Sequence, residues 1–175
     1  MMSLAAVFWL FLVVFGVIGG FRGWAKEILV SFSLVTGIAI DALLRQFFPP
    51  VGNLLVEPSS TGFYTRAVII LLMAYFGYQT PNLPALSAGG RFAREKLQDW
   101  LLGSIIGLIN GYLIIGTLWS YMNDAGYQGL QAFVSAPTDP AVLKYLEYMP
   151  TIWLKYPNVI FAVIIAFVFV IIVFV

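Results

Sequence analysis

Residues 19–29 (GGFRGWAKEIL) form a short, glycine-rich and charged segment between two long apolar runs. The candidate hinge residues are Gly20, Arg22, Gly23, Lys26 and Glu27. Each neighbouring run approaches or reaches the ~17–25 residues that a helix needs to cross ~30 Å of hydrocarbon. The pattern predicts two membrane helices joined by residues 19–29 as a hinge. The expected fold class is an all-α integral membrane protein.

The composition supports a membrane environment. Hydrophobic residues make up 61% of the 175 residues and charged residues 10%, against roughly a quarter charged in a soluble domain. A soluble protein of this length could not bury so much apolar surface. The net charge of +1 gives no basic field for nucleic acid. We therefore expect lipids and other integral membrane subunits as partners, and no nucleic acid.

The chain contains neither Cys nor His. This excludes thiolate or imidazole metal sites and thiol redox chemistry, and it removes the commonest general acid–base residue. A membrane-embedded enzyme would need a pair of carboxylates, which the pattern does not reveal. We predict no catalytic residue, no metal ligand, no cofactor and no enzymatic activity.

About five transmembrane helices and a short interfacial helix are expected. The apolar run Leu4–Ile18 lacks a basic segment before it, so we interpret it as a retained span rather than a signal peptide. The third span requires Arg66 to reach back to the headgroups, and a re-entrant half-helix is its alternative. The spans are expected at about residues 3–20, 26–48, 61–79, 101–122 and 159–175.

The connections differ in character. Pro49-Pro50 should end the second span and begin an ordinary loop over residues 49–60, and residues 80–98 form a second charged hinge. In residues 123–158, Asp139-Pro140 is a typical helix start. Val142, Tyr145, Leu146 and Met149 then share one face before Pro150. This segment is expected to lie on the membrane surface, with folding back over the helix ends as the alternative.

The last apolar run, residues 159–175, contains no polar residue and ends without an interfacial anchor. We therefore expect the protein to continue beyond Val175, and an intact mass would test this. The chain divides into a four-span part (1–122), an extracytoplasmic loop with the amphipathic segment (123–158) and an additional terminal helix (159–175).

The basic residues give a weak orientation signal. Five lie in the two short hinges and four in the longer opposite loops. Basic residues of short loops stay on the cytoplasmic side. Hinges 21–27 and 80–100 are thus expected in the cytoplasm, and the N-terminus outside.

Gly103, Gly107 and Gly111 recur every four residues in the fourth span. They share one helix face, where the missing side chain lets another backbone approach closely. The partner could be another subunit, but packing against the first three spans of this chain is favoured.

Asp41 lies within the hydrocarbon part of the second span, and Arg45 follows four residues later on the same face. Charges at this depth are candidates for proton or ion transport. An Asp–Arg pair in this order also forms a good intrahelical ion pair. We favour the structural pair, because no second acidic residue is expected deep in another span.

Other polar and aromatic residues suit packing and the interface. Asn110, Ser31, Ser33 and Thr36 could hydrogen-bond between helices. The tryptophans at predicted span ends fit an aromatic belt at the headgroups; they are Trp24, Trp100, Trp119 and Trp153.

Two motifs carry a family resemblance. The hinge has glycines at 20 and 23, a basic residue at 26, an acid at 27 and Arg22 between them. The fourth span has Asp99 followed by the three four-spaced glycines. In both motifs, residues 1–122 resemble the bacterial colicin V production protein family of small multi-span inner-membrane proteins. The resemblance implies an inner-membrane location and a link to toxin production.

The chain departs from that family in two respects. It has no acidic residue before Glu27, where the family usually carries one, and it adds the terminal run 159–175. Our leading functional expectation is a non-catalytic scaffold or accessory subunit of a larger membrane complex. The alternative is a small transporter or an export factor for toxins or peptides that uses Asp41.

Overall fold

The computed structural model describes residues 3–56, 58–79, 93–128, 134 and 136–174, and every regular element in these ranges is helical. Four helices are long and apolar enough to cross a membrane: α1 (Leu4–Arg22), α2 (Trp24–Phe47), α4 (Ser60–Tyr78) and α6 (Ala93–Asp124). A shorter apolar helix, α9 (Asn158–Phe174), follows near the end of the chain. The prediction of an all-α helical membrane bundle is confirmed.

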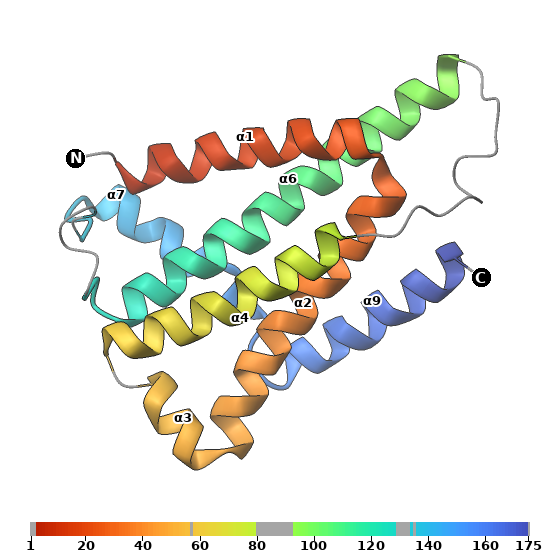
Figure 1. Cartoon of the computed structure of the whole chain (residues 1–175). Coiled ribbons are helices and arrows are strands. Elements are labelled where there is room, and N and C mark those ends of the chain that lie inside the picture. The colour runs from red at the N-terminus through yellow and green to blue at the C-terminus, as the bar shows by residue number, and fades with distance from the viewer. Residues whose placement is uncertain (1–2, 57, 80–92, 129–133, 135, 175) are drawn as a thin grey trace.

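Helix α2 lies at the centre of the bundle. It packs against α4, α6 and α9, whereas α1 packs mainly along α6 (Figure 1). The core where these elements meet is apolar and fully buried, with Val30 and Leu34 from α2 and Ile70 from α4 each at 0% exposure. Since α2 contacts most of the other elements, polar groups on α2 can join several helices at once.

The hinge after the first span is much shorter than expected. Helix α1 continues to Arg22 and α2 begins at Trp24, so Gly23 alone separates them. Gly23 has a φ of 85°, a left-handed conformation that glycine adopts at little cost. Asp99 Oδ1 accepts a hydrogen bond from the backbone N–H of Trp24 (3.2 Å) and so caps α2. Helix α2 therefore begins two residues before its expected start at Lys26, and the hinge residues on either side of Gly23 belong to helices.

The segment after α2 is also more ordered than expected. Helix α2 ends next to Pro49-Pro50 as predicted, but Pro49–Val56 forms helix α3 rather than a loop. Proline cannot continue a helix, yet its fixed φ suits the first turn of a new one. The two prolines therefore end one helix and start the next.

The four-spaced glycines of α6 face α1. A methyl group on Gly103 would overlap the carbonyl oxygen of Gly19, and one on Gly107 would overlap that of Phe15. On Gly111, it would lie 2.9 Å from Phe15 Cβ. The packing partner of this glycine face is therefore a helix of the same chain.

The segment after α6 folds back over the helix ends. It consists of α7 (Pro140–Leu143), the 3₁₀ helix η1 (Lys144–Tyr148) and α8 (Pro150–Trp153). Asp139 caps α7 by accepting a hydrogen bond from the N–H of Ala141 (2.8 Å), as its position predicted. Pro150 follows η1 but also starts α8.

The apolar side of this segment faces protein. Val142, Tyr145 and Leu146 pack on a buried cluster of Phe8, Trp119 and Met149. These contacts, with apolar partners from α1 and α6, fit the alternative of a segment folded back over the helix ends. Trp119, expected in the aromatic belt, does not face outward, since this side chain is 2% exposed and stacks with Tyr145. Trp153, in contrast, is half exposed.

The second charged hinge is seen only in part. Residues 80–92, with Arg91, lie outside the described residues. From Ala93 onward the predicted hinge is the first part of α6, which begins well before the expected start of the fourth span.

Candidate functional site

Buried charged side chains gather in two clusters on α2. We define the Asp41 cluster as Asp41, Arg45, Arg66, Tyr121 and Asp124. The Glu27 cluster consists of Arg22, Glu27, Ser31, Tyr78 and Asn110. Glu27 and Asp41 are fourteen positions apart on α2 (41 − 27), which corresponds to about 21 Å along a helix.

In the Asp41 cluster one carboxylate meets two guanidinium groups. Asp41 is 1% exposed, and its Oδ2 lies 2.9 Å from Arg45 Nη2, one helical turn away. Its Oδ1 accepts a hydrogen bond from Arg66 Nε at 3.1 Å. Arg66 Nη1 also donates to Asp124 Oδ2 at 2.9 Å. The predicted pair Asp41–Arg45 is therefore part of a four-charge network.

Arg66 does not reach back to the headgroups as the sequence suggested. It is 2% exposed, and its guanidinium carbon lies 3.7 Å from the centre of the Tyr121 ring. Two carboxylates and an aromatic face replace the water that the guanidinium would otherwise need. An arginine inside an apolar run requires such a partner. The position of Arg66 in an apolar run was therefore the sequence feature that could have predicted a buried acidic partner.

The Asp41 cluster is electrically balanced. It contains two arginines and two aspartates, contributed by α2, α4 and α6. Opposite charges at these distances attract strongly where little water is present. The arrangement therefore ties three helices together at one end of the bundle, and Asp41 has no uncompensated charge.

The Glu27 cluster is the second buried network. Glu27 is 0% exposed and accepts a hydrogen bond from Arg22 Nε at 2.8 Å. Asn110 Nδ2 donates to Glu27 Oε2 (2.8 Å) and to the Glu27 backbone carbonyl (2.9 Å). Ser31 Oγ donates to Asn110 Oδ1 at 2.6 Å. Arg22 also stacks on the ring of Tyr78, 4.6 Å from its centre.

This cluster adds a second buried carboxylate, on the same helix α2 as Asp41. The sequence placed Arg22 and Glu27 in a polar hinge, but α2 begins earlier and turns Glu27 inward toward α6. Asn110, predicted to bond between helices, does so through the carboxylate and backbone of Glu27. The hinge charges thus link α1, α2 and α6 as well as marking the end of the bundle.

Apolar side chains separate the two clusters. Leu34, Ile38 and Ile70 lie between them along the bundle and are 0–2% exposed. Ser33 donates to the Met73 carbonyl of α4, a bond between helices as predicted, whereas Thr36 donates to the Phe32 carbonyl within α2. Within the described residues, no printed hydrogen bond joins one cluster to the other, and this arrangement favours two separate structural networks.

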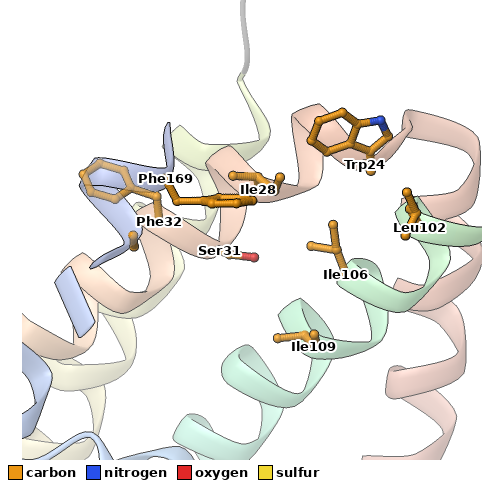
Figure 2. A pocket seen from close by; sticks show the side chains of 9 residues that line it. Trp24, Ile28, Ser31, Phe32, Leu102, Ile106, Ile109 and Phe169 are labelled. Atoms are coloured by element: carbon orange, nitrogen blue, oxygen red, sulfur yellow. The ribbon is translucent and has the colours of Figure 1, made fainter. Parts of the chain in front are cut away.

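A third feature is an apolar groove between α2, α6 and α9, with a volume of about 470 Å³ (Figure 2). Trp24 stands at one end and Ile109 at the other, with Ile106 and Phe169 between them. Ser31 is the polar residue of the lining, and its hydroxyl is engaged with Asn110. The groove suits a hydrocarbon ligand.

Among the described residues, no group of three or more acidic side chains converges that could hold a metal ion. Comparison with protein-family models, curated proteins and solved structures finds no match. The resemblance to the colicin V production family therefore depends on the hinge and glycine residues of the sequence. The functional argument depends on the geometry of the two clusters, the groove and the exposed helix faces.

Proposed function

We propose that this protein is a non-catalytic scaffold or accessory subunit of a larger protein complex in a bacterial inner membrane. The observation that carries the proposal is the outer face of α9. Phe161, Ile164, Ile165, Val168 and Ile172 share one side of this helix and are 48–72% exposed. This face is defined here as the α9 outer face.

The α9 outer face suits a partner helix. Helix α9 packs mainly on α2, so its opposite side projects from the bundle (Figure 1). A helix with so wide an apolar face is surrounded by lipid or by neighbouring helices, and a partner helix buries it.

The buried charges support the same proposal. Both clusters pair their carboxylates with guanidinium groups of this chain, so these groups act in holding the bundle together. Removing one partner of a buried ion pair leaves an uncompensated charge. Such clusters suit a rigid framework that presents outer helix faces to other subunits.

Purification in a mild detergent, followed by native mass spectrometry, tests the proposal. We expect a complex heavier than the single chain, containing at least one further membrane protein. The double variant Ile165→Ala/Ile172→Ala should release that protein. The matched variant Val13→Ala/Val17→Ala, on the exposed side of α1, should retain it. A single chain without a co-purifying protein overturns the proposal.

Transport through Asp41 is the second candidate, and the paired charges and apolar barrier described above count against it. Asp41→Asn separates the two functions. Loss of toxin or peptide export with an unchanged melting temperature supports transport. Loss of thermal stability, with export falling only as the folded protein disappears, supports the structural role.

The proposed topology has the N-terminus outside and residues 21–27 and 80–100 in the cytoplasm. Because the chain lacks cysteine, single cysteines can report on it directly. An impermeant thiol reagent added to intact cells should label Thr138→Cys and spare Gln98→Cys. The reverse labelling pattern overturns this orientation.

A further inference from the structure

The groove between α2, α6 and α9 has an acidic residue at its open end. Asp99 is exposed, and its Oδ1 accepts a hydrogen bond from the N–H of Trp24, which lines the groove. Leu102, one turn after Asp99 on α6, also lines it. The carboxylate is therefore held at the backbone of Trp24, whose indole ring stands at one end of the apolar lining (Figure 2).

The size of the groove selects the kind of occupant. Its lining extends from Trp24 to Phe32 on α2, about 12 Å at the rise of a helix. Ten residues of α-helix fill a cylinder ~15 Å long and ~10–12 Å wide, more than twice the 470 Å³ of the groove. The groove is therefore too small for a partner helix to enter. Its volume lies within the ~300–1,000 Å³ typical of small-molecule sites.

The lining selects the chemistry of that occupant. No charged side chain lines the groove, and most of the lining is aliphatic or aromatic. A hydrocarbon chain gains from burial there, and the surrounding bilayer supplies such chains at high concentration. The upper part of one lipid acyl chain fits this length and chemistry.

The charge at the open end selects the headgroup. Among the described residues, no basic side chain lies within ion-pair distance of Asp99. The carboxylate attracts an ammonium group through its charge, and the face of the Trp24 ring, which lines the same groove, attracts it as well. Lys26 lies two residues from both Trp24 and Ile28, so it is on the opposite side of α2.

We propose that this groove binds one phospholipid with an ethanolamine headgroup. Its ammonium group lies at Asp99 and Trp24, and one acyl chain lies along Ile28, Ile106 and Ile109. The site adds a specific lipid to the architecture and is independent of the proposed partner on the α9 outer face. Helix α9 contributes to both the lipid site and the partner surface, but through different sides of the helix.

Lipid binding can be measured on the full chain. The purified protein is delipidated, exposed to mixed micelles containing equal amounts of phosphatidylethanolamine and phosphatidylglycerol, and analysed by native mass spectrometry. We expect one phosphatidylethanolamine to remain bound per chain. Equal retention of the two lipids, preference for phosphatidylglycerol, or no retained lipid overturns the proposal.

Two pairs of variants test the two parts of the site. Asp99→Asn keeps an oxygen to cap α2 but removes the charge, and should lower phosphatidylethanolamine binding about three- to tenfold. Lys96→Gln, which changes an exposed charge three residues earlier on α6, should leave it unchanged. Loss of lipid binding in Lys96→Gln, but not in Asp99→Asn, overturns the proposal and indicates an anionic headgroup.

The acyl chain is tested by filling the groove. Ile106→Trp should remove most of the bound lipid, whereas Ile105→Trp, on an exposed position of the same helix, should leave it bound. Melting temperature is recorded for every variant. Unchanged lipid binding in a folded Ile106→Trp protein overturns the assignment of the groove.

Discussion

Replacing Arg66 with methionine removes the one positive charge that joins α4 to both aspartates of the Asp41 cluster. The cluster then changes from two positive and two negative charges to one positive and two negative. Breaking a buried pair in this way costs ~3–5 kcal/mol in other proteins. Asp41 retains Arg45, and Asp124 is 44% exposed to solvent, so we expect the lower end, about 3 kcal/mol.

Thermal melting in mild detergent, followed by far-UV circular dichroism, measures this loss. A cost of about 3 kcal/mol lowers the melting temperature by about 6–12 °C, on the scale of a chain this long. Lys155→Met is the matched control, because it also replaces a positive charge with methionine, but at an exposed position. It should change the melting temperature by at most about 1–2 °C.

A double-mutant cycle separates the ion pair from the loss of packing. Asp41→Asn alone should also cost about 3 kcal/mol, because Arg66 then lacks its buried carboxylate. The double variant Asp41→Asn/Arg66→Met should cost at least about 1.5 kcal/mol less than the sum of the single changes. Additive effects, or an Arg66→Met protein as stable as Lys155→Met, would refute the account of the cluster.

The same melting measurement tests three further positions. Gly107→Ala should cost about 1–3 kcal/mol, because its methyl group overlaps the backbone of Phe15 in α1, whereas Ile105→Ala on the exposed side of α6 should cost less. Asn110→Leu should cost about 1–3 kcal/mol by removing the hydrogen-bond donor of Glu27 Oε2; an unchanged melting temperature would contradict this. Trp119→Ala should cost about 3–5 kcal/mol, and Trp153→Ala, at a half-exposed residue, under about 1 kcal/mol. Equal losses for the two tryptophans would show that the segment after α6 does not cover Trp119.

Local patterns in this chain predicted local structure well. The lengths of the apolar runs predicted the four long helices, because crossing a bilayer requires a minimum helix length. Asp139 before Pro140 predicted a capped helix start, since the cap is formed within three residues. The ion pair of Asp41 and Arg45 also follows from spacing alone, because residues four apart meet on one helix face.

Errors arose where one residue decides between a turn and a continuing helix. Gly23 turns the chain by itself, so a hinge expected over eleven residues contracts to one. Pro49 was interpreted as the start of a loop, although the same proline geometry can start a helix. In both cases composition indicated a break and could not give its length.

Pairings between distant residues were decided by the tertiary structure. Arg66 is 25 positions from Asp41, and Asn110 is 83 positions from Glu27. These contacts depend on how α4 and α6 rotate about their axes and which faces they turn toward α2. The four-spaced glycines likewise predicted a close approach, while the identity of the approaching helix, α1, came from the fold.

The sequence by itself determined a helical membrane protein without cysteine or histidine chemistry, because composition and run length are properties of the chain alone. The tertiary structure decided what its charges do. Helices that are almost uniformly apolar have few features that fix their rotation, and the rare buried polar groups supply them by pairing across the bundle. Glu27 and Asp41 thus became internal ties, and Asp99 was left exposed at the open end of a groove.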